Sequence, residues 1–240
     1  MNTTDAVDWH TSIAEDFAAG YDRSPRFRER LAVWRGLIAR HVHGGDRVLD
    51  AGCGAGTFSF EAADRGARVE GIDGSPAMIA LCRKRAAASP QADVRFDVAL
   101  LETLSTRPAG SVDVVMSSSV LEYLPDLEGE VARLARLLPV GGRLLLSLPN
   151  AASRYRRIER LAFRLTRRPR YYAHVRSLAT EAEMRDIFAR CGLEMIETTD
   201  YAVPPGPAWL RRALGLDRGG QMLLVAVGRR GVDADATGTP

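Results

Sequence analysis

The chain has 240 residues, of which 46% are hydrophobic and 26% charged, with a net charge of +3. This length and composition predict one globular α/β domain, and the small net charge without an aromatic stacking platform argues against nucleic-acid binding. Apolar runs stay short of the roughly 18–20 residues that cross a membrane. The acidic beginning MNTTDAVDWH differs from a signal peptide, so we expect a cytoplasmic protein.

Segments with strand-like and helix-like patterns alternate along the chain. Between loose ends at residues 1–8 and 231–240, the expected order is strand 47–50, helix 57–65, strand 67–73, helix 76–88, strand 94–98, strand 112–117, helix 127–138, strand 143–148, helix 181–191, strand 193–198 and strand 222–227. This alternation predicts a mostly parallel sheet with helices on both faces, in a single domain covering residues 1–240. Ligands of such sheets bind at the carboxyl ends of the strands.

A glycine loop follows the first expected strand in the stretch RVLDAGCGAGTFS, residues 47–59. Its spacing is GxGxG after Asp50, whereas the dinucleotide fingerprint is GxGxxG. An acid before the loop suits a ligand with a cationic group better than one with a pyrophosphate. Asp73 ends the next strand, where a carboxylate can accept both ribose hydroxyls. A ribose and a cation without phosphate describe S-adenosylmethionine.

Four segments in order resemble the motifs of class I S-adenosylmethionine-dependent methyltransferases, especially the ubiquinone-pathway O-methyltransferases and other small-molecule methyltransferases. These segments are VLDAGCGAGTFS, GIDGSPAMI, SVDVVMSSSVLEYLPD and LLPVGGRLLLSLPN. The resemblance implies a Rossmann-like, seven-stranded, mostly parallel sheet with a helical lid after the fifth strand. It also implies S-adenosylmethionine as cofactor and S-adenosylhomocysteine as product.

The resemblance further implies a set of cofactor-binding residues. The glycine loop would hold the methionine moiety, Asp73 the ribose, and Met78 the adenine. The full set is Asp50, Ala51, Gly52, Cys53, Gly54, Gly56, Asp73, Gly74, Ser75, Met78, Leu100, Ser117 and Tyr21. Each of two residues also has a structural alternative. Met78 fits a core position on an amphipathic helix equally well, and Tyr21 could instead pack as a hydrophobic staple that fixes the start of a helix. Many relatives carry an acid that meets the adenine amino group, and that position falls here on Leu100 or near Asp97.

Candidate catalytic residues lie after the fourth strand and in the lid. Relatives that methylate phenols often carry Glu-His where this chain has Glu122-Tyr123, so a structural role for this pair stays open. The lid offers Tyr155, Tyr171, Tyr172 and His174, and histidine titrates near neutrality, as a general base should. We expect His174, Tyr172 and Glu122 to be the catalytic candidates, although a lone lid histidine is more often structural.

Metal and disulfide sites are not expected. The three cysteines lack CxxC spacing, and no acids and histidines cluster at ligand spacing.

The lid, residues 151–178, contains an arginine-rich insert. Residues 154–176 hold nine arginines and one acid, and Ile158, Leu161, Ala162 and Leu165 recur on one helical face. Such a helix is typical of a peripheral membrane contact, here through residues 154–170. The alternative is that the apolar stripe packs on the sheet while the arginines form a solvated face.

The expected activity is methyl transfer to an oxygen of a phenolic, carboxylic or lipid-like acceptor, which is hydrophobic or anionic. N- or C-methylation, an inactive S-adenosylmethionine-binding protein and a nicotinamide oxidoreductase are the alternatives. The GxGxG spacing argues against the last of these.

Overall fold

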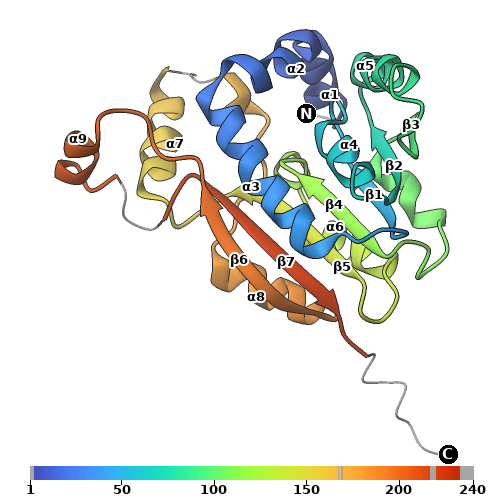
Figure 1. Cartoon of the computed structure of the whole chain (residues 1–240). Helices are drawn as coiled ribbons and strands as arrows, with labels where there is room; N and C mark the ends of the chain where they lie inside the picture. Colours follow the sequence, from blue (N-terminus) through green and yellow to red (C-terminus); the bar gives the residue numbers. More distant parts are fainter. Residues whose placement is uncertain (1–2, 167, 169, 217–219, 233–240) are drawn as a thin grey trace, which may run out of the picture.

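The computed structural model describes residues 3–166, 168, 170–216 and 220–232, which form an α/β sandwich around one sheet (Figure 1). The seven strands are β1 (Arg47–Ala51), β2 (Arg68–Asp73), β3 (Val94–Val98), β4 (Val114–Ser118), β5 (Arg143–Pro149), β6 (Leu193–Tyr201) and β7 (Leu223–Arg230). They lie in the order β3-β2-β1-β4-β5-β7-β6, and only β7 runs antiparallel to its neighbours. The predicted mostly parallel, Rossmann-like sheet is confirmed.

Helices cover both faces of this sheet (Figure 1). One face carries α3 (Pro25–His41), α4 (Thr57–Ala63) and α5 (Pro76–Ala87), and the other carries α6 (Leu127–Arg136) and α8 (Glu181–Arg190). Successive residues of β1 point to opposite faces, so Val48 joins the core under α3 while Leu49 joins the core under α6. Burial on both faces explains why these strands are nearly continuous apolar runs.

The first residues of the chain are more ordered than expected. Residues 3–8 were expected to be a loose end but belong to α1 (Thr3–Ser12), and α2 (Ala14–Arg23) follows. Figure 1 shows both helices above the carboxyl ends of the parallel strands. Thr11 of α1 donates a 2.8 Å hydrogen bond to the Ser75 hydroxyl, and this tertiary contact was invisible to local patterning. Of the expected loose end at 231–240, residues 233–240 lie outside the described part.

The arginine-rich insert forms α7 (Arg154–Thr166), followed by the short helix η3 (Arg170–Ala173). Its apolar stripe does not pack on the sheet, because Ile158, Leu161 and Leu165 are 46%, 58% and 79% exposed. The inward face instead carries the buried ion pair of Arg156 and Glu159, at 2.7 Å. The alternative of a sheet-packed stripe is therefore wrong.

A further short helix, α9 (Ala208–Ala213), was not expected from the sequence. Figure 1 shows it at the far left, on the same side of the molecule as α7. None of the helices among the described residues is long and apolar enough to cross a membrane.

Candidate functional site

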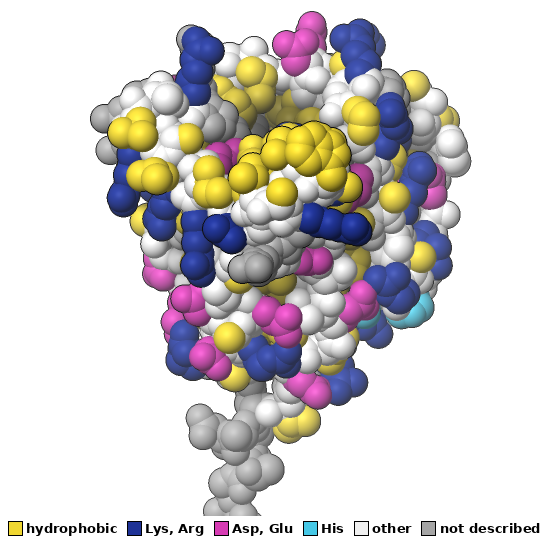
Figure 2. All heavy atoms as spheres, turned by 90° about the vertical axis from the view of Figure 1, so that its left-hand side faces the viewer, with side chains coloured by type: hydrophobic (Ala, Val, Ile, Leu, Met, Phe, Trp, Pro, Cys, Tyr) yellow, Lys and Arg dark blue, Asp and Glu magenta, His cyan; other side chains and the backbone are white. Residues whose placement is uncertain are grey.

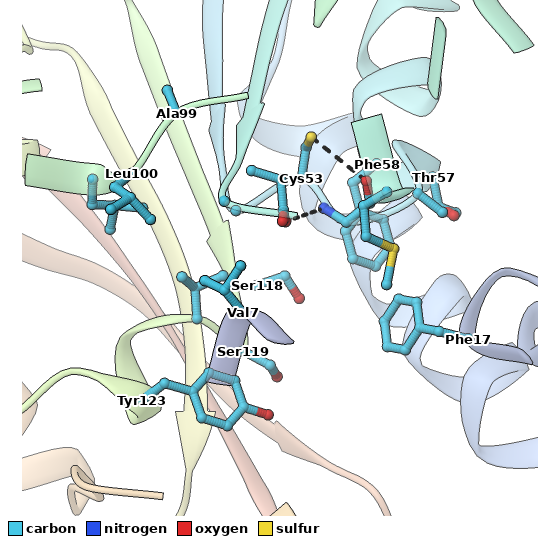
Figure 3. Close-up of a pocket in the computed structure, with 18 of the residues that line it drawn as sticks. Val7, Phe17, Cys53, Thr57, Phe58, Ala99, Leu100, Ser118, Ser119 and Tyr123 are labelled. Atoms are coloured by element: carbon cyan, nitrogen blue, oxygen red, sulfur yellow. Dashed lines mark hydrogen bonds between the residues drawn. The ribbon is translucent and has the colours of Figure 1, made fainter. Parts of the chain in front are cut away.

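A pocket opens at the carboxyl ends of β1, β2 and β4, under α1 and α2 (Figure 3). In Figure 3, Ala99 and Leu100 occupy one side of the pocket, and Phe17, Thr57 and Phe58 occupy the opposite one. The residues that line it are Val7, Phe17, Tyr21, Arg30, Gly52, Cys53, Gly54, Ala55, Thr57, Phe58, Asp73, Gly74, Met78, Ala99, Leu100, Leu101, Glu102, Ser118, Ser119, Val120, Tyr123 and Leu124. Eight of the thirteen residues expected to bind cofactor are in this lining.

The glycine loop forms one wall because side chains are excluded there. Gly52 has a φ of 80°, and a Cβ at this position would lie 2.2 Å from a Val120 methyl group. The backbone N–H groups of Gly52 and Cys53 donate to the Ile72 carbonyl at 2.8 and 2.9 Å. The loop is thus tied to β2, and a ligand can approach its backbone closely.

Asp73 stands at the end of β2 and faces the pocket. Its carboxylate accepts hydrogen bonds from the backbone N–H groups of Gly54, at 2.9 Å, and Ser75, at 2.8 Å. Burial raises the pKa of this carboxyl above its usual value, although both hydrogen bonds oppose the rise. Each oxygen keeps a lone pair, so the oriented carboxylate can accept the two hydroxyls of a ribose.

Asp50 lies beneath the loop and not in the pocket lining. It is buried, and its carboxylate accepts a 2.6 Å hydrogen bond from the Ser59 hydroxyl. Burial raises its pKa to about 6, while the Ser59 hydrogen bond acts in the opposite direction. From this position, the negative charge of Asp50 can attract a bound cation across the loop, without direct contact.

Four other expected cofactor residues also stand behind the lining. Ser117 donates to the Ala51 carbonyl at 3.1 Å, and Ser75 caps α5 by accepting from the Met78 N–H. The four residues, which support the wall, are Ala51, Gly56, Ser75 and Ser117.

The expected adenine side of the pocket is apolar, with one acid at its rim. Met78 is both buried and in the lining, so the two interpretations of this residue are compatible. Leu100 lines the pocket, whereas Asp97 points away and pairs with Arg83 at 3.3 Å. Glu102, which was not among the expected residues, is the acid of this loop that lines the pocket. It lies two residues beyond Leu100, the position at which the sequence placed the adenine-binding acid of the relatives.

Arg30 is the most notable residue that sequence reasoning missed. It comes from α3, lines the pocket, and donates to the backbone and side-chain oxygens of Ser118 at 3.0 and 2.8 Å. Its guanidinium also lies over the rings of Phe17, at 5.8 Å, and Phe58, at 5.4 Å. Its Nε has no hydrogen-bond partner among the described residues. The abundance of arginine hid this residue, because nothing local distinguishes it.

Glu122 is buried next to the pocket, whereas its neighbour Tyr123 lines it. Burial raises the pKa of Glu122 to about 7, and the charges of Arg30 and Arg156 oppose this rise. Its Oε2 has no hydrogen-bond partner among the described residues. The structure thus places a carboxyl that titrates near neutrality beside Arg30, one residue removed from the pocket.

The lid candidates lie apart from this pocket. The His174 ring stacks on Trp9 of α1 at 5.8 Å, and the Tyr172 ring packs against Phe163 at 5.5 Å. Tyr155 packs against the core under α3, and the side chain of Tyr171 lies outside the described part. None of the three catalytic candidates His174, Tyr172 and Glu122 is in the pocket lining. Over the described ranges, no three His, Cys, Asp or Glu side chains are grouped to hold a metal.

Tyr21 of α2 lines the pocket as expected. Its ring packs edge-on against Phe17, Phe27 and Phe58 at 5.0–6.1 Å. Burial raises the pKa of its phenol, so the hydroxyl is neutral near pH 7. The Tyr21 ring thus both lines the pocket and packs α2 against its neighbours, so the two expected roles are compatible.

A family model described as a methyltransferase domain matches residues 17–198, which include the whole glycine loop, Asp73 and Arg30. The chain belongs to this methyltransferase family. Membership implies S-adenosylmethionine as methyl donor and S-adenosylhomocysteine as product. The pocket fits this donor, because it combines a glycine-rich loop, an oriented carboxylate and an apolar wall at Met78.

Individual relatives agree with this assignment. A ubiquinone biosynthesis O-methyltransferase from Xanthomonas axonopodis is 30% identical over 74% of this chain and 73% of its own length. An aklanonic acid methyltransferase from Streptomyces is 42% identical over 44% of this chain and 49% of its own. The chain spans about half the length of most of the curated relatives it matches, including that of Idiomarina loihiensis.

The fold also matches solved structures. The magnesium protoporphyrin IX methyltransferase of Synechocystis, with bound S-adenosylhomocysteine, superposes with a TM-score of 0.72. It is 20% identical, and the match covers 96% of this chain and 100% of that one.

Proposed function

We propose that this chain transfers the methyl group of S-adenosylmethionine to an oxygen atom of a small, largely apolar acceptor. The observation that carries this proposal is one pocket whose lining combines Asp73 and the glycine loop with aromatic rings and a cation. Asp73 and the loop would hold the donor, and Phe17, Phe58 and the guanidinium of Arg30, which line the same pocket, would contact the acceptor.

Bound S-adenosylmethionine supplies a methyl group that its sulfonium has already activated. The protein's task is then to align an acceptor lone pair with the carbon–sulfur bond and to exclude water. Asp73 would bind the ribose, Met78 and Leu100 would contact the adenine, and Arg30 would bind a carboxylate. Phe17 and Tyr21 of α2 would exclude water from the reacting atoms.

A phenolic acceptor must also lose its proton. Glu122 is the candidate whose pKa of about 7 suits a general base, and Tyr123 could relay the proton because it lines the pocket. His174 and Tyr172 would need the lid to move before they could reach the acceptor. For an N or C acceptor the same donor-binding residues would serve, and these acceptors remain the alternatives.

The names of the relatives support oxygen as the acceptor atom. Several of the curated relatives are named ubiquinone biosynthesis O-methyltransferases.

The experiment uses methyl-labelled S-adenosylmethionine with an organic extract of the source cells. Wild-type protein should transfer label to a compound that partitions into the organic phase. Asp73→Asn keeps the shape of the side chain but loses its charge, and it should weaken S-adenosylmethionine binding about 10- to 100-fold in calorimetry.

Asp97→Asn is the matched control, since that acid ends the adjacent strand but points away from the pocket. It should bind like the wild type. Unchanged affinity of Asp73→Asn would remove the ribose assignment. Binding without transfer of label to any fraction would favour the inactive binding protein.

We also propose that the protein contacts an anionic membrane surface through α7 and α9. Figure 2 faces this side of the molecule, where hydrophobic side chains gather in the upper half with basic ones among and below them. The exposed apolar side chains on these two helices and directly after α9 are Ile158, Leu161, Leu165, Trp209 and Leu214. Five arginines and a single acid on α7 complement an anionic lipid surface.

A further inference from the structure

A second cavity, of about 400 Å³, lies between α7 and the beginning of α8. It shares no lining residue with the candidate cofactor pocket. Four arginines, a tyrosine and a serine dominate its lining, which consists of Leu127, Ala151, Arg156, Arg157, Arg160, Tyr172, Arg176, Ser177, Leu178 and Glu183.

The positive charge of this cavity is only partly compensated. Arg156 pairs with Glu159 at 2.7 Å, but among the described residues no carboxylate lies within 4.0 Å of Arg157, Arg160 or Arg176. The single acid in the lining, Glu183, is already engaged. Its Oε2 accepts from the N–H and hydroxyl of Thr180, at 2.7 and 2.9 Å, in the capping box of α8.

The walls of the cavity are held in place by hydrogen bonds. The Arg156 guanidinium donates to the Met222 carbonyl at 3.0 Å, which anchors α7 beside β7. Arg176 and Ser177 donate their backbone N–H groups to the Glu122 carbonyl at 2.6 and 3.0 Å. The backbone segments that carry the arginines are therefore anchored, while the side chains of Arg157, Arg160 and Arg176 are exposed and accessible to a ligand.

We propose that this cavity binds a phosphate group. Three uncompensated guanidinium groups around a polar cavity suit a ligand with several anionic oxygens, because each planar guanidinium can donate two parallel hydrogen bonds to it. The phosphate belongs either to a phospholipid headgroup or to a free phosphorylated compound. The exposed apolar face of α7 is continuous with Arg157 and Arg160 on the same helix, which would direct the cavity toward a lipid surface.

This site does not depend on the proposed methyl transfer, since its ligand is measured without S-adenosylmethionine. The test is calorimetry with inorganic pyrophosphate and glycerol 3-phosphate, and co-sedimentation with phosphatidylglycerol or phosphatidylcholine vesicles. The variant of the second cavity, called the pocket variant below, is Arg157→Gln with Arg160→Gln. The matched control is Arg154→Gln with Arg164→Gln. All four arginines are exposed on α7, but Arg154 and Arg164 do not line the cavity.

The pocket variant should lose at least about tenfold in affinity for these phosphates, while the control stays within about twofold of the wild type. Binding of phosphatidylglycerol vesicles that glycerol 3-phosphate competes away would identify a lipid headgroup. Binding of free phosphates without vesicle binding would identify a soluble phosphorylated ligand. Equal losses in both variants would overturn the proposal, because they would mean a diffuse charge effect, and so would a wild-type protein that binds none of these probes.

Discussion

Glu122, Arg30 and Asp50 show how burial changes the chemistry of single residues here. Arg30 is half-buried, with its guanidinium over the rings of Phe17 and Phe58, and its hydrogen bonds to Ser118 hold it at the pocket wall. Glu122 lies near this cation, but burial outweighs the attraction and raises its pKa to about 7. A buried carboxyl held close to neutrality is typical of functional sites, and it also makes stability depend on pH.

The pH dependence of stability tests the position of Glu122. Its pKa is about 7 in the folded chain against 4.5 when unperturbed, so the folded state binds more protons between these values. The free energy of unfolding should therefore fall as pH rises through this window, by about 3 kcal/mol from Glu122 alone. Glu122→Gln should remove most of that fall in denaturant titrations across the window. The Glu122→Gln protein should keep a pH dependence of the same sign but smaller than that of the wild type, because burial also raises the pKa of Asp50, to about 6.

Glu128→Gln is the control for this prediction. Its exposed carboxyl pairs with Arg190, which lowers its pKa, so its own effect lies at more acidic pH. The variant should keep the wild-type slope. A Glu122→Gln protein with the wild-type slope would mean that this carboxyl is not desolvated.

The helix α7 is amphipathic, but its apolar face points to solvent and its buried face carries an ion pair. Its inward face holds Arg156 and Glu159, which are buried together, whereas its apolar residues face outward. Figure 1 shows α7 and α9 on the same side of the molecule, and Trp209 of α9 is 70% exposed. An exposed apolar patch surrounded by basic residues marks an interaction surface.

Vesicle binding tests this surface. Leu161→Ser with Leu165→Ser should lower co-sedimentation with phosphatidylglycerol vesicles at least about tenfold, since both side chains would leave the lipid. Val98→Ser with Val140→Ser is the matched control, because these side chains are also exposed, at 48% and 62%, but lie at the end of β3 and in the loop before β5. The membrane proposal fails if both pairs of substitutions have the same effect, or if wild-type protein ignores anionic vesicles.

At the scale of the whole molecule, the sheet separates two cores. Trp34 of α3 is fully buried in one of them and stacks on Phe58 of α4 at 4.8 Å. This contact joins the N-terminal helices to the helix that follows the glycine loop, so the core also supports the pocket wall. Arg40 and His41 of α3 further bind Glu197 of β6, at 2.5 and 2.7 Å. These contacts tie the first third of the chain to its last.

The chain's tryptophans offer a direct test of this core. Trp34→Ala should lower the free energy of unfolding by about 3–5 kcal/mol, because it removes a large buried side chain and leaves a cavity. Trp209→Ala removes the same side chain from an exposed position and should change stability by less than about 0.5 kcal/mol. Denaturant unfolding of both variants measures the difference, and similar losses would contradict the packing described.

The sequence by itself determined the order of strands and helices, the glycine loop and the position of Asp73. These features depend on local causes: apolar periodicity, helix caps, and a turn at Gly52 that excludes a side chain. Only the tertiary structure decided that β7 inserts between β5 and β6, that Arg30 lines the pocket, and that the lid histidine lies apart from it. The tertiary structure also decided that the apolar stripe of α7 points outward. Each depends on contacts between residues far apart in the chain, which local patterns do not encode.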